Sequence, residues 1–147
     1  MPNEKRDLSD ETVTAWARLV RISQAVLSKV EADLKAADLP PLSWYDALLE
    51  LERARPDGLR PYRLQERMLL AQYNMSRLTD RLAKAGYIER EDCSDDGRGQ
   101  ILKIDSAGRG LLQRMWPVYR KAIAAHFAEK LDTDETAALS RMLIKLR

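Results

Sequence analysis

The stretch of sequence that decides the fold runs from residue 74 to residue 108 and reads NMSRLTDRLAKAGYIEREDCSDDGRGQILKIDSAG. Its first part has helical periodicity, because apolar side chains recur every three to four residues. These apolar residues are Met75, Leu78, Leu82 and Ala85. A polar stripe at the same spacing lies beside them and consists of Asn74, Arg77, Arg81 and Lys84. We expect a helix over residues 72–85 that packs with one side and can meet phosphate with the other.

A β-hairpin is predicted directly after this helix. Gly86 has the conformational freedom that the left-handed residue at a helix end requires. Residues 87–91 then alternate between apolar and charged side chains, which is typical of a half-buried strand, and residues 100–104 fit a returning strand. Residues 93–99 are rich in Asp and Gly, which tolerate the positive φ of hairpin turns. The two strands and their turn would form a wing.

Two helices and a loop are predicted before this stretch. Residues 10–36 carry apolar side chains at helical intervals without an internal Gly or Pro, which predicts one long amphipathic helix. The segment LPPL at residues 39–42 ends it, because proline cannot continue a helix. Ser43 is an expected N-cap for a shorter helix over residues 44–53. Residues 54–61 contain two prolines and a glycine and therefore predict a loop.

Residues 64–70 would form the first helix of a helix-turn-helix, with residues 72–85 as the second. After the hairpin, Asp105 or Ser106 can cap another helix, in which Pro117 predicts a kink. A last apolar segment follows at residues 133–146. Both ends of the chain thus carry more apolar helix than a small basic head needs for its own core. We expect the ends to pack together across a two-fold axis.

These elements predict a mainly α protein with a small β wing. A winged helix-turn-helix head would span residues 43–104. N-terminal and C-terminal helical segments, residues 10–37 and 106–147, would form a dimerisation scaffold. A length of 147 residues fits a single domain of this kind.

In its middle third the chain resembles the MarR family of transcriptional regulators. The resemblance rests on SRLTDRL at residues 76–82, AGYIER at 85–90, DGR at 96–98 and IDSAGR at 104–109, where the family usually has Leu-Thr-x-x-Gly-Arg. The predicted order of elements over the whole chain also fits. The resemblance implies a homodimer that binds DNA.

The predicted DNA contacts follow from placing the helix over residues 72–85 in the major groove, where its N-terminal and outward side chains can reach base edges. The candidates for base or phosphate contacts are Gln72, Asn74, Ser76 and Arg77. Arg81 and Lys84 are expected on the DNA backbone, with Arg63 and Arg67 of the preceding helix as weaker candidates. The alternative for such a basic stripe is a solvated helix face.

The wing supplies two further candidates. Arg98 at the tip of the turn could enter the minor groove, where the negative potential of narrow A·T segments favours a guanidinium. Asp96 cannot contact phosphate favourably, so we expect it to support the wing by pairing with Arg98 or with an arginine of the recognition helix. The alternative is that Asp96 is only a turn residue.

Several aromatic residues fall in segments that would flank the junction between scaffold and head: Trp16, Trp44, Tyr45, Trp116 and Tyr119. The MarR resemblance implies an effector pocket for phenolic or other small hydrophobic ligands at this junction. The alternative for each of these residues is a place in the core or the interface.

Composition excludes several classes of protein. No apolar run approaches the roughly 18 residues that a membrane helix needs, and the N-terminus lacks the apolar core of a signal peptide, so we expect a cytoplasmic protein. The single cysteine, Cys93, excludes an internal disulfide and is expected to be passive, because neighbouring acidic residues raise a thiol pKa. His126 has no partners at ligand spacing, so neither a metal nor another cofactor is expected.

Positive charge is concentrated in the predicted head. Residues 53–121 contain 15 Lys and Arg against 9 Asp and Glu, whereas residues 1–52 contain 6 against 10 and residues 122–147 contain 4 against 4. A basic middle between acidic or neutral ends is the distribution expected of a phosphate-binding head on a separate scaffold.

Together with the MarR resemblance, which implies release by a small effector, the pattern favours a homodimeric repressor that binds a palindromic operator. The alternative is a winged-helix module that binds a protein and no specific DNA. Leu69, Ala71 and Gln65 leave it open, since they depart from the Gly, Ser and small residue usual at those positions in the family. An enzyme is not expected, because the chain has no nucleophile with a paired base, no Gly-rich phosphate loop and no cluster of metal ligands.

Overall fold

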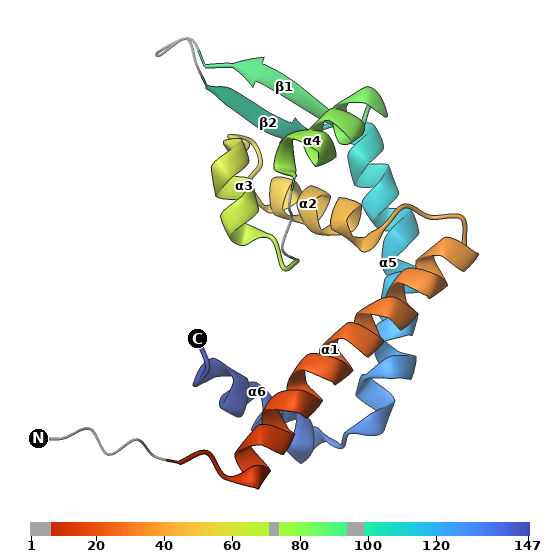
Figure 1. Cartoon of the computed structure of the whole chain (residues 1–147). Helices are drawn as coiled ribbons and strands as arrows, with labels where there is room; N and C mark the ends of the chain where they lie inside the picture. Colours follow the sequence, from red (N-terminus) through yellow and green to blue (C-terminus); the bar gives the residue numbers. More distant parts are fainter. Residues whose placement is uncertain (1–6, 71–73, 94–98) are drawn as a thin grey trace, which may run out of the picture.

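The computed structural model describes residues 7–70, 74–93 and 99–147. It is an elongated, mainly helical molecule with a compact head at one end and long helices at the other (Figure 1). The predicted fold class, mainly α with a β wing, is confirmed. In chain order its elements are α1 (Asp10–Ala36), α2 (Leu42–Arg53), α3 (Pro61–Arg67), α4 (Met75–Lys84), β1 (Ile88–Asp92), β2 (Gln100–Ile104), α5 (Ser106–His126), the 3₁₀ turn η1 (Ala128–Lys130) and α6 (Thr133–Ile144).

The long helix α1 has the bounds predicted from its periodicity. Ser9 caps it, because its Oγ accepts a hydrogen bond from the backbone N–H of Thr12 at 3.1 Å. The helix packs against α5, and Val30 and Leu34 near its C-terminal end are buried. Its N-terminal half leaves apolar side chains exposed, among them Trp16. Within the described part of one chain, much of the apolar face of α1 is therefore left uncovered.

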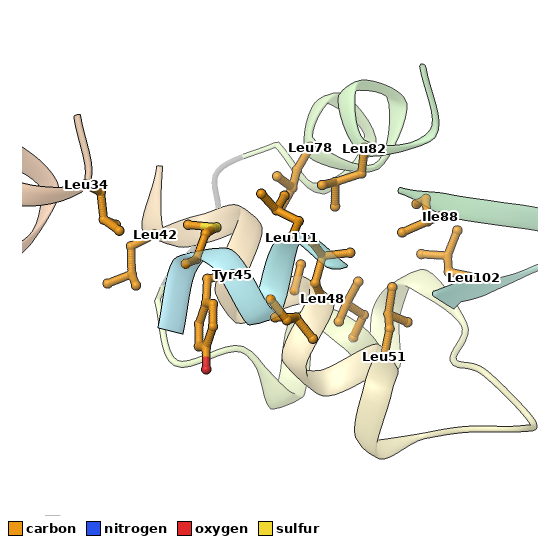
Figure 2. Packing of buried hydrophobic residues seen from close by; sticks show 14 of the residues in the cluster. Leu34, Leu42, Tyr45, Leu48, Leu51, Leu78, Leu82, Ile88, Leu102 and Leu111 are labelled. Atoms are coloured by element: carbon orange, nitrogen blue, oxygen red, sulfur yellow. The ribbon is translucent and has the colours of Figure 1, made fainter. Parts of the chain in front are cut away.

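The core of the head forms where α2 crosses the first half of α5 and meets α4 and the sheet (Figure 2). Leu48 and Leu51 of α2 are fully buried, as are Leu82 of α4 and Leu102 of β2. Leucines from three elements thus converge on one centre. This packing holds α4 and the wing in fixed positions on a common base.

The prediction that Ser43 caps α2 was wrong. The helix begins two residues earlier than predicted, at Leu42, and Pro41 occupies the N-cap position without a side-chain hydrogen bond. The backbone N–H of Leu42 donates instead to Oε1 of Glu31 at 2.8 Å. A side chain of α1 therefore accepts the hydrogen bond of a free backbone N–H at the start of α2. The sequence around Leu42 does not show this contact.

The first helix of the helix-turn-helix lies three residues earlier than predicted, at Pro61–Arg67. Proline is well suited to the first helical position, because its φ is fixed and its missing N–H would have no partner there. Just before it, Leu59 pairs with Leu102 through backbone hydrogen bonds of 3.0 and 2.8 Å. This bridge attaches the predicted loop to the sheet and sets the start of α3.

The wing is an antiparallel pair in which Ile88 lies opposite Ile104 and Asp92 opposite Gln100. The first strand begins one residue later than predicted, while the second has the predicted bounds. Gly86 has a φ of +81°, which confirms its predicted place at the end of α4. Residues 94–98 of the predicted turn lie outside the described part of the chain.

The helix α5 connects head and scaffold (Figure 1). Asp105 is its N-cap residue, but its carboxylate accepts a hydrogen bond from Oγ of Ser106 at 3.1 Å and makes no cap bond to the helix backbone. The helix continues through Pro117 to His126. Its first half packs in the head and its second half beside α1, so a movement of either part reaches the other along one helix.

Candidate nucleic-acid interface

The exposed face of α4 is the centre of the candidate site. The helix packs into the head through Leu78, Thr79 and Leu82, which are all buried. Ala85, predicted on this packed side, is exposed at the C-cap, because the helix ends before it can turn inward. Five of the predicted DNA-contacting residues lie on the exposed side of the helix: Asn74, Ser76, Arg77, Arg81 and Lys84.

The N-terminus of α4 is organised by Asn74. Its Oδ1 accepts a hydrogen bond from the backbone N–H of Arg77 at 2.9 Å, which makes Asn74 the N-cap of the helix. Inside the first turn, Oγ1 of Thr79 donates to the carbonyl of Ser76 at 3.1 Å. Gln72, predicted at the start of this helix, lies outside the described residues.

An ion pair connects α4 to the wing. A guanidinium nitrogen of Arg90 on β1 donates to the carboxylate of Asp80 on α4. This ion pair joins β1 of the wing to the recognition helix. The sequence had suggested Asp96 for such a role. Asp96 itself and Arg98 lie outside the described residues.

Sequence reasoning missed the residue that holds the turn between α3 and α4. The carboxylate of Asp46, which α2 carries into the head, accepts hydrogen bonds from the backbone N–H groups of Leu69 at 3.0 Å and Leu70 at 2.9 Å. Asp46 is only 6% exposed, whereas the side chain of Leu69 is exposed. An acidic residue within the apolar run around Leu48 was the available signal, since a buried carboxylate needs donors.

The preceding helix α3 presents two exposed arginines, Arg63 and Arg67. The guanidinium of Arg63 is 3.2 Å from the carboxylate of Glu66 and lies 5.1 Å from the ring centre of Tyr62. The hydrogen bond with Glu66 raises the pKa of Arg63 above its ordinary value, so the side chain stays charged. These contacts keep Arg63 on its own helix.

Three of the five predicted pocket aromatics come together where α2 meets α5. The ring centres of Tyr45 and Tyr119 are 5.1 Å apart, and Trp116 lies 6.3 Å from Tyr45 and 5.9 Å from Tyr119. Burial is the main cause that raises the pKa of both tyrosines above the ordinary value. The structure does not bring the other two there: Trp44 contacts Tyr87 at 6.0 Å, and Trp16 is 66% exposed on α1.

The remaining candidates from the sequence have other neighbours. His126 at the end of α5 lies 2.8 Å from Asp33 of α1. The half-buried Cys93 accepts a hydrogen bond from Arg60 at 3.4 Å. Within the described ranges, no three His, Cys, Asp or Glu side chains are grouped as a metal ion would require. The helices described here also include none with the length and apolar character to cross a membrane.

Comparisons with known proteins agree with this geometry. Residues 37–99 match the model of the MarR family. The chain is 26% identical over 141 residues to an HTH-type transcriptional regulator of Bacillus cereus. The aligned region covers 95% of this chain and 92% of that protein. Its fold is similar to that of Sco3205, a MarR family regulator from Streptomyces coelicolor solved in complex with DNA, with a TM-score of 0.86, 23% identity, and coverage of 99% and 91%. It is also similar to the organohalide-sensing regulator RdhR-CbdbA1625 bound to 2,4-dichlorophenol, with a TM-score of 0.78, 20% identity, and coverage of 100% and 85%.

Proposed function

Because residues 37–99 match the model of the MarR family of transcriptional regulators, we propose that the chain is a regulator of this kind, which acts as a homodimeric repressor of a palindromic operator and is released by a small hydrophobic or phenolic effector. The observation that carries the proposal is the exposed basic face of α4 beside the wing. In this proposal Gln72, Asn74, Ser76 and Arg77 approach base edges or nearby phosphates. The DNA backbone is contacted by Arg81 and Lys84, and the wing reaches the minor groove through Arg98.

The structure around α4 supports the proposal that this helix binds in the major groove of DNA. The helix is anchored by its buried side, braced to the wing by the pair of Asp80 with Arg90, and exposed along Arg77 and Arg81. A guanidinium on such a face can form bidentate hydrogen bonds with guanine or pair with phosphate. The DNA complex of the similar regulator Sco3205 supports the same use of this fold.

The homodimer is supported by apolar surface that one chain leaves uncovered. Ile22 of α1 is 58% exposed and Ile144 of α6 is 61% exposed, and both lie on the scaffold away from the head. A second copy would cover the apolar faces of α1 and α6 and could present two α4 helices about 34 Å apart, one turn of DNA.

The effector proposal rests on the aromatic cluster of Tyr45, Trp116 and Tyr119. The cluster lies where α2 of the head meets α5, so a ligand inserted between these rings would move the head relative to the scaffold. A groove of about 650 Å³ between α1 and α5 is lined by apolar side chains together with Asp33, Lys121 and His126, and Pro117 and Val118 in its lining lie between Trp116 and Tyr119 in the sequence. The similar regulator solved with 2,4-dichlorophenol supports a phenolic ligand. Release would follow because two heads at a changed angle cannot contact both half-sites.

The proposal is tested by measuring affinity for a selected duplex over a range of salt concentrations. Phosphate contacts release counterions, so the logarithm of the affinity should fall linearly with the logarithm of salt. Arg81→Ala should reduce this slope by about one, and Arg77→Ala should cost about 1–3 kcal/mol if Arg77 reads a base. The control is Lys130→Ala, an exposed lysine near α6 on the scaffold, which should leave both quantities unchanged.

If both arginine variants bind like the wild type, α4 is not the DNA contact and the protein-interaction alternative gains weight. That alternative was motivated by the unusual residues of the turn, including Leu69. The described part of the turn is held by Asp46, and the side chain of Leu69 points to solvent without contributing to the core. We therefore favour DNA binding.

A further inference from the structure

Asp46 is a buried acid placed under the helix-turn-helix. Its side chain has 6% of its surface exposed, and each of its two oxygens accepts a hydrogen bond from a different backbone N–H, that of Leu69 at 3.0 Å and that of Leu70 at 2.9 Å. Burial of a carboxylate is costly unless donors compensate for the lost water. Hydrogen bonds to a charged acceptor are about twice as strong as neutral ones. The turn therefore receives two strong bonds from a different helix.

The two N–H groups belong to the segment that decides the direction of α4. The helix α3 ends with Met68 at an extended ψ of 140°, and α4 begins only after Asn74. The backbone N–H groups of Leu69 and Leu70 lie after the end of α3 and need acceptors when they are removed from water. Because Asp46 belongs to α2, its carboxylate ties this segment to the core of the head.

We propose that Asp46 is a positioning residue for DNA recognition, which sets the path of the chain between α3 and α4 and so the orientation of α4 in the groove. The inference rests on the proposed function and deepens it. Asp46 is buried and touches no DNA; it acts through the backbone of Leu69 and Leu70. Two recognition helices must fit two half-sites at once, so a small rotation of α4 in each protomer weakens both contacts.

The same carboxylate lies beside the aromatic cluster. Its negative charge is the second cause, after burial, that raises the pKa of Tyr119, and Asp46 follows Tyr45 directly on α2. Successive residues of a helix point about 100° apart. One turn of α2 thus contacts α5 through Tyr45 and the turn before α4 through Asp46, which places the positioning residue between the effector cluster and the recognition helix.

The test is Asp46→Asn, which keeps the shape of the side chain but directs an NH₂ group toward one of the two backbone N–H groups. Glu50→Gln is the matched control, because Glu50 is an acid on the same helix that pairs with Arg53 at 2.8 Å away from the turn. For Asp46→Asn we expect affinity for the selected operator to fall about tenfold or more, since one strong hydrogen bond is lost and an unpaired donor remains. Affinity for random duplex, the circular dichroism spectrum and the oligomeric mass should match those of the wild type and of Glu50→Gln.

A purely structural role gives a different result. If Asp46→Asn lowers the melting temperature but each folded molecule keeps its preference for the operator over random duplex, the proposal is overturned. Should Asp46→Asn fail to fold, Asp46→Ser replaces it, because a hydroxyl keeps one acceptor without presenting an NH₂ group. Loss of operator preference in folded Asp46→Ser supports the proposal, and retention overturns it.

Hydrogen exchange separates a failure of this inference from a failure of the proposed function. In the wild-type protein the amides of Leu69 and Leu70 should be protected, and Asp46→Asn should expose them while Glu50→Gln should not. If the wild type prefers no duplex but this exchange pattern holds, the DNA function fails and the hold of Asp46 on the turn stands. If the amides exchange equally in all three proteins, Asp46 does not position the turn, whatever DNA the protein binds.

Discussion

Ile22 on α1 offers the sharpest test of the proposed dimer. Its side chain is 58% exposed and lies in an apolar groove between α1 and α6, with Leu139 and Leu143 on the opposite side. We expect Ile22→Asp to shift the protein from dimer to monomer while each chain stays folded. The reason is that the change removes apolar contact from the proposed interface and places a carboxylate there.

The expected magnitude follows from this exposed fraction. Full burial of an isoleucine side chain is worth about 1.5–3 kcal/mol, so covering the exposed part of Ile22 contributes roughly 1–1.7 kcal/mol. A two-fold interface contains the residue twice, which gives roughly 2–3.5 kcal/mol per dimer. The dissociation constant should therefore rise roughly 30- to 300-fold. The cost of burying two carboxylates adds to this, so the range is a lower bound.

Sedimentation equilibrium over a concentration series measures this constant directly, with a monomer mass of 16.8 kDa. Tyr62→Asp is the matched control, because Tyr62 is 54% exposed but belongs to α3 in the head. This variant should associate like the wild type. The reasoning is refuted if folded Ile22→Asp dimerises with the wild-type constant, since the apolar face of α1 would then lie outside the interface.

Two further predictions concern the packing of the head. A Cβ at Gly108 would lie 2.3 Å from the backbone oxygen of Tyr87, whereas a Cβ at Gly86 meets open space at a φ of +81°. In urea denaturation, Gly108→Ala should cost about 3 kcal/mol or more and Gly86→Ala about 1 kcal/mol, and equal costs would argue against this packing. Burial raises the pKa of Tyr45 and of Tyr119, so phenolate absorbance should show both ionising later than an exposed tyrosine. Their contribution to stability should be fully present below about pH 10 and be lost as the pH rises through the raised values; replacing both with Phe should flatten this alkaline loss, and an unchanged loss would contradict the assignment.

Local sequence patterns predicted the elements that local forces determine. These elements are the helices α1 and α4, the helix end at Gly86 and the two strands of the wing. Each is determined by side chains that lie within a few residues of one another in the sequence. The start of α2 was not predicted correctly, because it depends on Glu31, which lies 11 residues earlier on another helix. The bounds of α3 depend likewise on the bridge between Leu59 and Leu102. Such long-range contacts leave no periodic signal.

The candidate site divides in the same way. The basic stripe of α4 was predictable, because residues three and four apart share one face of a helix. Asp46 was missed, since its partners Leu69 and Leu70 are backbone groups 23 and 24 residues away. The separation of Trp16 and Trp44 from the aromatic cluster also depends on how whole helices pack. The sequence shows that these two residues are aromatic, but it does not show which residues they contact in the folded protein.

In the proposed function this protein reads a palindromic DNA sequence as a dimer. The most direct test is to select duplexes from a random pool with the purified protein at about 150 mM salt, where phosphate contacts alone are weakened, and to sequence the bound fraction. We predict enrichment of an inverted repeat with half-sites about one helical turn, roughly 10 base pairs, apart. A bound fraction with no enriched sequence would contradict the claim.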